Sequence, residues 1–421
     1  MFGIQKKIEK QLQIQLEPSE FLLKIIINKL ADLGVRLNRL QLKTLRCQLK
    51  ETNPAITFDL TDLQVARAKI KSRSELEKAV ELVLSEIFPE AFQKIDKIKD
   101  RLPDIMLNLA EHAGEFFFRQ IRRTYRYGLN NRREHQAYFE KDILSIWCRA
   151  ITQLEVLLIL SIESIGYIDK MFHAEKTVYS ETKWIVLNRL HGRACQITGE
   201  IICLLKSGYA DGAEARWRSL HELSVVSAFI FDHDDYVADQ YVQHDIIEEY
   251  KEVLQQQSCY PELNEDIEFC AYKSEVERKR VELIEKYGKH FGEDYGWAFP
   301  VLGGKKPSFR QIEEHVNLSS VRYAYRKASH NIHAGVRGTF LRLGLHPQSQ
   351  SEIILAGASD YGLEKLGSCA AASLLLSTVT LLHGVELIDA AIFMKIIAKQ
   401  AEITRKEFRR AHRSMAQSNI D

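Results

Sequence analysis

The chain has 421 residues and a formal net charge of +1, with 45% hydrophobic and 27% charged residues, a composition typical of a folded protein with a sizeable core. These values exclude an intrinsically disordered chain, and they exclude attraction of a nucleic acid through overall charge, so such a partner would have to bind at local basic patches. Seven scattered cysteines without a CxxC pair argue against a disulfide framework and a zinc ribbon, and they indicate a reducing cytoplasm.

The N-terminal sequence has no apolar signal segment, so we expect a cytoplasmic protein. The most apolar stretches, residues 151–168 and 366–382, are interrupted by glutamates or rich in small residues. We therefore expect them to be buried core helices, and we expect no membrane partner.

The first 57 residues are predicted to form a small basic helical module. Apolar residues recur at helical spacing over Phe21–Leu33, and Gly34 marks the end of that helix. A second amphipathic helix, Leu37–Leu49, is rich in arginine and lysine. Because proline is scarce and helical spacing continues along the chain, the predicted fold class is all-α, a multi-helix bundle with this smaller N-terminal helical module.

Residues 58–142 are predicted to form a helical connecting arm. One helix is expected over Thr61–Phe88, with Pro89 and Pro103 separating the helices that follow. Further along, four arginines share one helix face beside Tyr125 and Tyr127. They are Arg119, Arg122, Arg123 and Arg126. This basic stripe would bind a nucleic-acid backbone and stack bases, and the alternative is a solvated helix face.

Residues 143–396 are predicted to form the helical-bundle core, followed by a basic C-terminal tail over residues 397–421. Seven helices are expected in the core, at residues 143–170, 180–206, 211–231, 235–257, 264–290, 309–332 and 362–396. Two segments rich in glycine and proline, 294–308 and 344–362, are expected to be ordered loops over a pocket.

The segment RKASHNIH, residues 326–333, holds the strongest candidate for chemistry. With about 100° per residue in a helix, four polar side chains fall on one face, namely Arg326, Ser329, His330 and His333. Arg322 and Arg337 would extend this stripe at each end. Imidazoles that exchange protons near neutral pH, beside arginines that hold anions, are what phosphodiester cleavage requires. The alternative is a solvated polar face.

A second polar group lies on the apolar helix expected at 211–231. Glu214, Arg218, His221 and Glu222 share one face, and Arg218 and Glu222 have the spacing of an intrahelical ion pair. Since buried charges are costly unless paired, these residues either support the candidate site from a neighbouring helix or form a structural ion pair inside the bundle.

Metal and cofactor chemistry is less well supported. A His, His–Asp, Asp pattern of the HD phosphohydrolase type can be traced loosely through His221, His244, Asp245 and Asp360. No HExxH, phosphate-loop or dinucleotide-binding motif is present. We therefore expect no metal and no cofactor, and a metal-dependent phosphohydrolase is the third alternative.

Four motifs in this order resemble a bacterial family classified as a domain of unknown function. The resemblance covers roughly residues 145–395, and its motifs are RSLHEL at 218–223, DYGWA at 294–298, YRKASHNIHAG at 325–335 and LAGASDYGL at 355–363. It carries no assigned activity.

A more remote similarity is to the HEPN superfamily, all-α proteins whose ribonuclease members have an Arg, four to six residues, then His. Arg326 and His333 match that spacing, although Lys327 stands where the family often has Asn or His. The resemblance implies a metal-independent endoribonuclease of a toxin or antiphage system, acting on RNA as a homodimer, with a partner or activating protein that it does not identify.

In that scheme His333 removes the 2′-hydroxyl proton, Arg326 stabilises the phosphate, and His330 protonates the leaving oxygen. Ser329 and Asn331 would add hydrogen bonds. The non-enzymatic alternative is a helical binding or regulatory protein, in which the polar stripe fixes helix register.

Overall fold

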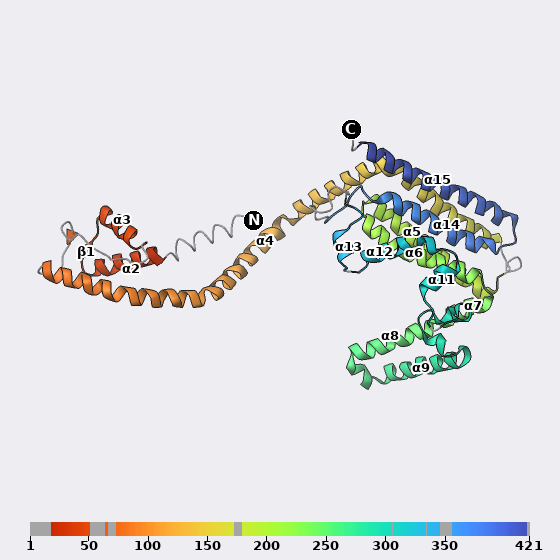
Figure 1. The fold of residues 1–421 in the computed structure, drawn as a ribbon, viewed down its shortest axis with the longest axis horizontal. Helices are drawn as coiled ribbons and strands as arrows, with labels where there is room; N and C mark the ends of the chain where they lie inside the picture. Colours follow the sequence, from red (N-terminus) through yellow and green to blue (C-terminus); the bar gives the residue numbers. More distant parts are fainter. Residues whose placement is uncertain are drawn as a thin grey trace. The chain divides into compact units, whose positions relative to one another are not determined.

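The computed structural model describes residues 18–50, 64–65, 73–171, 179–304, 306–333, 335–345 and 356–418. The chain divides into two compact units, Met1–Leu129 and Asn130–Asp421 (Figure 1). The predicted all-α class, a multi-helix bundle with a smaller N-terminal helical module, is confirmed. Residues 1–17 and 51–57 of the predicted module lie outside the described residues.

The first unit holds two short helices and the N-terminal half of a long one. Its described elements are α2 (Pro18–Asp32), β1 (Val35–Arg36), α3 (Arg39–Gln48), β2 (Gln64–Val65) and the beginning of α4 (Arg73–Met171). Gly34 follows α2 with φ of 81°, a conformation that favours glycine and that ends the helix as predicted. Asn38 caps α3, since its side-chain oxygen accepts a hydrogen bond from the backbone N–H of Gln41, while the side-chain oxygen of Gln41 accepts one from the backbone N–H of Asn38.

The long helix α4 departs from two sequence predictions. The helix expected from Thr61 begins at Arg73, and residues 64–65 pair with β1 in a two-residue antiparallel ladder. Pro89 and Pro103 were expected to separate helices, yet both lie within α4. A proline removes one backbone hydrogen bond from a helix, which weakens the helix without always ending it.

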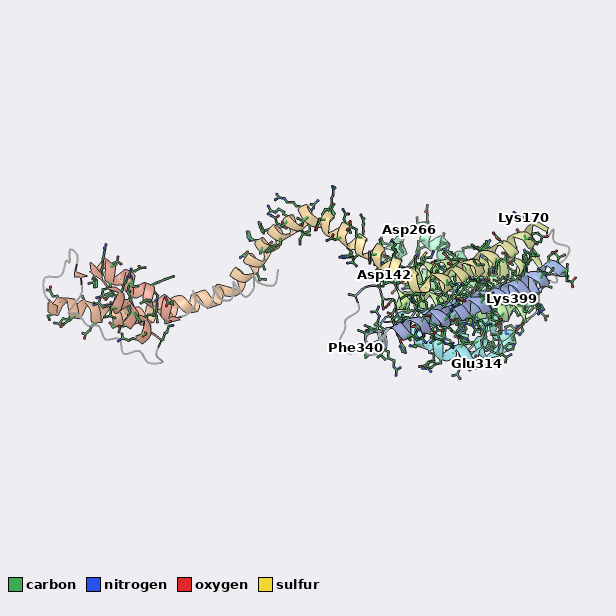
Figure 2. The ribbon with its side chains drawn as sticks, turned by 90° about the horizontal axis from the view of Figure 1, so that it is seen from above. Asp142, Lys170, Asp266, Glu314, Phe340 and Lys399 are labelled. Carbon is green, nitrogen blue, oxygen red and sulfur yellow. The ribbon has the colours of Figure 1, made fainter. Side chains whose placement is uncertain are left out.

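The core of the second unit is a bundle of five long helices. They are the C-terminal half of α4, α5 (Glu181–Lys206), α6 (Ala210–Phe231), α14 (Leu363–His383) and α15 (Ile388–Ser418). Trp147, Trp217 and Phe408 are almost fully buried among them. Figure 2 shows α15 lying along the α4 segment that ends near Lys170, and Gln153 of α4 accepts hydrogen bonds from Gln400 and Thr404 of α15.

The predicted basic tail, residues 397–421, is wrong because α15 continues through it to Ser418. One face of this segment is buried at helical spacing, and its members are Ile397, Ala401, Thr404, Phe408, Ala411 and Met415. The many lysines and arginines on the other face hid this apolar stripe.

The remaining helices, most of them short, lie along one side of the bundle or beyond its end (Figure 1). After α6 the order is α7 (Asp235–Gln243), α8 (Asp245–Cys259), η1 (Pro261–Glu265), α9 (Ile267–Tyr287), η2 (Lys289–Gly292), η3 (Gly296–Ala298), α10 (Phe299–Leu302), α11 (Phe309–His315), η4 (Ser319–Val321), α12 (Arg322–Ala328), η5 (Ser329–Asn331) and α13 (Val336–Phe340).

Three helices predicted as continuous are therefore divided. The 235–257 segment is divided into α7 and α8 at His244. The 309–332 segment breaks after α11, where Asn317 has φ of 57°, and the 362–396 segment breaks between α14 and α15. A left-handed residue cannot continue a right-handed helix, which accounts for the break after α11.

Two described helices contain a stretch long and apolar enough to cross a membrane, one within Ala110–Lys170 and one in Leu363–His383. Length and apolarity do not separate a membrane span from the core helix of a globular domain. In the second stretch 61% of the residues are buried inside the protein, where α14 packs against α5, α6 and α15.

Candidate functional site

The RKASHNIH segment is not one continuous helix. Helix α12 ends at Ala328, a single 3-10 turn continues to Asn331, and His333 lies beyond it with an exposed side chain. Arg337 belongs to the separate helix α13. The predicted continuous helix from Arg326 to His333 is therefore wrong, because the α-helix ends at Ala328 and only a 3-10 turn follows it.

Part of the predicted site nevertheless converges on one pocket of about 420 Å³, which we call the basic pocket. Its walls come from α6, α12, η5 and α13 and consist of Glu214, Tyr323, Arg326, Lys327, His330, Asn331, Arg337 and Leu341. A Cβ atom at Gly338 would lie 1.8 Å from the His330 carbonyl oxygen, so this close approach of α13 to η5 requires glycine. The close approach brings Arg337 beside Arg326 without a continuous helix.

Glu214 is the acid of the basic pocket. Its side chain is almost fully buried, one carboxylate oxygen accepts a hydrogen bond from Asn331 Nδ2 at 2.6 Å, and the other oxygen, Oε1, has no hydrogen-bond partner in the described structure. Burial raises the pKa of Glu214, and this effect outweighs the nearby charges of Lys327 and Lys365, which lower it. An under-bonded buried carboxylate beside cations is suited to accept a proton or a hydroxyl hydrogen bond.

One turn further along α6, Arg218 and Glu222 form the predicted ion pair, with 3.2 Å between Arg218 Nη2 and Glu222 Oε1. Both contact Tyr325 of α12: its hydroxyl donates to Glu222 and accepts from Arg218 Nη2 at 2.8 Å. The Arg218 guanidinium also lies over the Tyr325 ring, 4.8 Å from its centre. These contacts fasten α12 to α6.

His221 and Glu313 form a second, fully buried link. His221 Nε2 lies 2.8 Å from Glu313 Oε1, and their side chains are 3% and 0% exposed. Arg322 donates to the other Glu313 oxygen at 3.1 Å, so it is held by this carboxylate and does not line the basic pocket. Burial lowers the pKa of His221 more strongly than the Glu313 contact raises it, which favours a neutral imidazole that donates its Nε2 proton.

The predicted supporting residues therefore divide into two groups. Asn331 lies at the basic pocket, where it orients Glu214. Ser329 bonds to the Tyr325 carbonyl inside the helix at 3.2 Å, while Arg218, His221 and Glu222 belong to the interhelical links.

The DYGWA loop lines a different and larger opening of about 1060 Å³, which we call the large cleft. Asp294, Tyr295 and Trp297 face it across from α5. Tyr295 has φ of 58°, and a Cβ at Gly296 would lie 2.4 Å from the Phe291 carbonyl oxygen, so the loop conformation depends on glycine there. Of the segment 294–308, which was expected to border a pocket, Asp294, Tyr295 and Trp297 line the large cleft, whereas residues 346–355 of the other loop lie outside the described residues.

The traced HD-type pattern does not form a cluster. Within the described residues, no group of three or more His, Cys, Asp or Glu side chains is arranged to hold a metal ion. His221 is bonded to Glu313, and His244 Nε2 is bonded to the Glu293 carbonyl at 2.9 Å.

The basic stripe on α4 is helical as predicted, and its four arginines, Arg119, Arg122, Arg123 and Arg126, are exposed. Phe116, Phe118, Tyr125 and Tyr127 are also more than half exposed, which is unusual for large aromatic side chains. This exposed aromatic and basic surface has the composition expected of a nucleic-acid contact.

The part of the chain that contains both pockets also matches a known protein family. Residues 185–350 match the model of DUF5677, a family of unknown function. The matched region includes α6, α12 and the DYGWA loop, and therefore the walls of both the basic pocket and the large cleft. The comparison with curated proteins gave no match, and neither did the comparison with solved structures.

Sequence reasoning missed the roles of three residues. Glu214 was placed on the polar face of its helix but not recognised as a pocket wall, and Tyr325 and Glu313 were not singled out. The spacing of Glu214, Arg218 and His221, four and then three residues apart, was the available signal for a shared face. Nothing in the sequence pairs His221 with Glu313, 92 residues away.

Proposed function

We propose that this protein is a metal-independent endoribonuclease whose reaction takes place in the basic pocket. The observation that supports this proposal is the meeting of Arg326, Lys327, Arg337 and His330 with a buried carboxylate, Glu214, that lacks a hydrogen bond at Oε1. Cations bind a phosphodiester, and a carboxylate with an imidazole provides the two proton transfers that its cleavage needs.

In the proposed reaction, Glu214 Oε1 accepts the proton of the ribose 2′-hydroxyl as its oxygen attacks phosphorus. The bond from phosphorus to the 5′-oxygen breaks, and His330 donates a proton to that leaving oxygen. The products are a 2′,3′-cyclic phosphate and a free 5′-hydroxyl. In this reaction the 2′-hydroxyl proton is removed by Glu214 and not by His333, because His333 does not line the pocket.

Arg326 and Arg337 are proposed to neutralise the charge that develops on the phosphoryl oxygens. Asn331 donates to Glu214 Oε2 at 2.6 Å, so Oε1 is the carboxylate oxygen that still lacks a hydrogen bond. We propose that the stripe on α4 binds the RNA backbone through its guanidinium groups and stacks bases on its exposed aromatic side chains.

The test is cleavage of a uniformly labelled RNA by the full chain in the presence of a chelator. Cleavage is expected to persist, to leave 2′,3′-cyclic phosphate ends, and to fall by roughly 100-fold or more in Glu214→Gln, which keeps the shape of the side chain and removes the base. Intact RNA, or cleavage that needs a metal ion and leaves 5′-phosphates, would contradict the proposal.

The second candidate is a binding or regulatory protein that uses the same pocket without catalysis. The two links between α6 and α12, at Tyr325 and at Glu313, support it, because they fix helix register as a structural polar network would. Tight RNA binding by the full chain, with no cleavage in either the native protein or Glu214→Gln, would favour this candidate.

A further inference from the structure

The large cleft is built from different elements than the basic pocket. One wall is α5, and the facing wall combines the end of α7, the beginning of α8 and the DYGWA loop. Between them the surface is apolar and aromatic, with Leu190, Leu223, Tyr241 and Tyr295. An opening of about 1060 Å³ with such a lining has the size and composition of a site for an organic ligand.

Charges of opposite sign lie on the two walls. Helix α5 contributes Arg189 and Arg193, whereas α8 and the loop contribute Asp245, Glu248 and Asp294. A ligand that fills the cleft therefore meets cations at one side and carboxylates at the other, so it needs both an anionic group and hydrogen-bond donors.

Several of these charges are already engaged. Lys251 Nζ lies 2.7 Å from Glu248 Oε1 and 2.8 Å from Asp294 Oδ1, and Arg193 donates to Gln196 at 2.7 Å. In the described part of the chain, Arg189 and Asp245 take part in no hydrogen bond or ion pair through their side chains. These two groups are therefore left for a ligand.

We propose that the large cleft binds a guanine nucleotide, with its phosphate at Arg189, its base against Tyr241 and Tyr295, and its Watson–Crick edge at Asp245. A carboxylate only accepts hydrogen bonds, and guanine presents two adjacent donors, N1–H and the 2-amino group, that match its two oxygens. Adenine offers one amino group beside an acceptor nitrogen and fits a carboxylate less well. The aromatic side chains add stacking, which every base accepts.

The experiment is calorimetric titration of the full chain with guanosine monophosphate, adenosine monophosphate, guanosine and inorganic phosphate. We expect saturable binding that is tightest for guanosine monophosphate. Arg189→Ala should weaken it by roughly tenfold, toward the affinity for guanosine, because one charge-assisted hydrogen-bonding group is lost. Asp245→Asn should remove the preference for guanine over adenine.

The matched control is Arg409→Ala, which removes an exposed arginine of α15 outside the cleft and should leave the titration unchanged. Arg189 and Asp245 are both exposed, so the variants keep the core intact, as circular dichroism will check.

No saturation by guanosine monophosphate up to about 1 mM, equal affinity for the two monophosphates in the native protein, or an equal loss in Arg409→Ala would overturn the proposal. Because binding is measured without RNA, the result is independent of the proposed cleavage.

Discussion

Two histidines within the same region have opposite environments. His221 is 3% exposed, lies 2.8 Å from a buried carboxylate, and is surrounded by the rings of Trp217 and Tyr325. His330 is exposed on the wall of the basic pocket, where the nearby carboxylate of Glu214 has an oxygen without a partner. The difference teaches that a satisfied buried histidine holds helices together, whereas an open one beside an unsatisfied acid remains available to a ligand.

The largest expected effect comes from breaking the buried link between His221 and Glu313. Glu313→Ala removes the partner of both His221 and Arg322 and leaves a buried imidazole without its acceptor. We expect a loss of roughly 3–5 kcal/mol in the free energy of unfolding, the typical result of removing one member of a buried pair. Urea denaturation followed by circular dichroism measures it.

The next residue is a matched control for that change. Glu314 pairs with Arg310 on the exposed side of α11, with 2.7 Å between Arg310 Nε and Glu314 Oε1. Glu314→Ala should leave the unfolding midpoint almost unchanged, because exposed ion pairs contribute little. Equal losses from the two substitutions would show that the buried link has no special role.

A smaller effect is expected from Tyr325→Phe, which removes the hydroxyl shared by Glu222 and Arg218 but keeps the ring beneath the guanidinium. The loss should be about 1–2 kcal/mol, the range for a hydrogen bond to charged groups. Tyr323→Phe, at a side chain that is 78% exposed, is the control and should not alter stability. No difference between the two tyrosines would mean that the hydroxyl does not fasten α12 to α6.

Replacing Glu214 should raise the stability of the protein, whereas replacing Glu313 or Tyr325 should lower it, since the buried carboxylate of Glu214 destabilises the folded state. Burial raises the pKa of Glu214 in the folded protein, so folding favours the protonated carboxyl. The stability that comes from this protonation is present at pH values below the ordinary carboxyl pKa, and it is lost as the pH rises through the raised pKa of the folded protein. Glu214→Gln is therefore expected to be more stable than the native protein near neutral pH, by roughly 1 kcal/mol, with the gain vanishing under acidic conditions. Thermal unfolding across a pH series measures this difference.

A gain in stability together with a loss of RNA cleavage would indicate that Glu214 is kept for function. Destabilisation of Glu214→Gln at neutral pH would instead place Glu214 with His221 among the structural residues.

The smallest effects on the fold are expected at the exposed stripe of α4. Replacing both Arg122 and Arg126 by alanine should leave stability unchanged but weaken RNA binding and lower the slope of its salt dependence by roughly one for each arginine. The pair Arg405 and Arg409 has the same spacing on an exposed face of α15 and provides the control. An equal change in the control pair would mean that only overall charge was altered.

Much of the architecture could be predicted from local pattern. The bounds of α2, α5 and α6 lie within a few residues of the predicted ones, because Gly34 and apolar periodicity both act over a few residues. The continuation of α15 could not be recognised from its net charge, because the buried stripe that keeps it folded is narrow and depends on packing against α4.

The site was predicted only in part for a related reason. Arg326 and His330 were assigned from helical spacing, and they do share a pocket. One continuous helix would place His333 and Arg322 with them, whereas the helix ends at Ala328, His333 does not line the pocket, and Glu313 holds Arg322. The contribution of Glu214 depends on a contact with Asn331, 117 residues away, which no local spacing encodes.

The most direct test of the basic pocket as a ribonuclease site compares two histidines three positions apart. RNA cleavage is measured, with chelator present, for the native chain, His330→Ala and His333→Ala, both of which replace exposed side chains. Because His330 lines the pocket and His333 does not, we predict a fall of roughly 100-fold or more for His330→Ala and native activity for His333→Ala. Full activity in His330→Ala, or a loss confined to His333→Ala, would contradict the assignment.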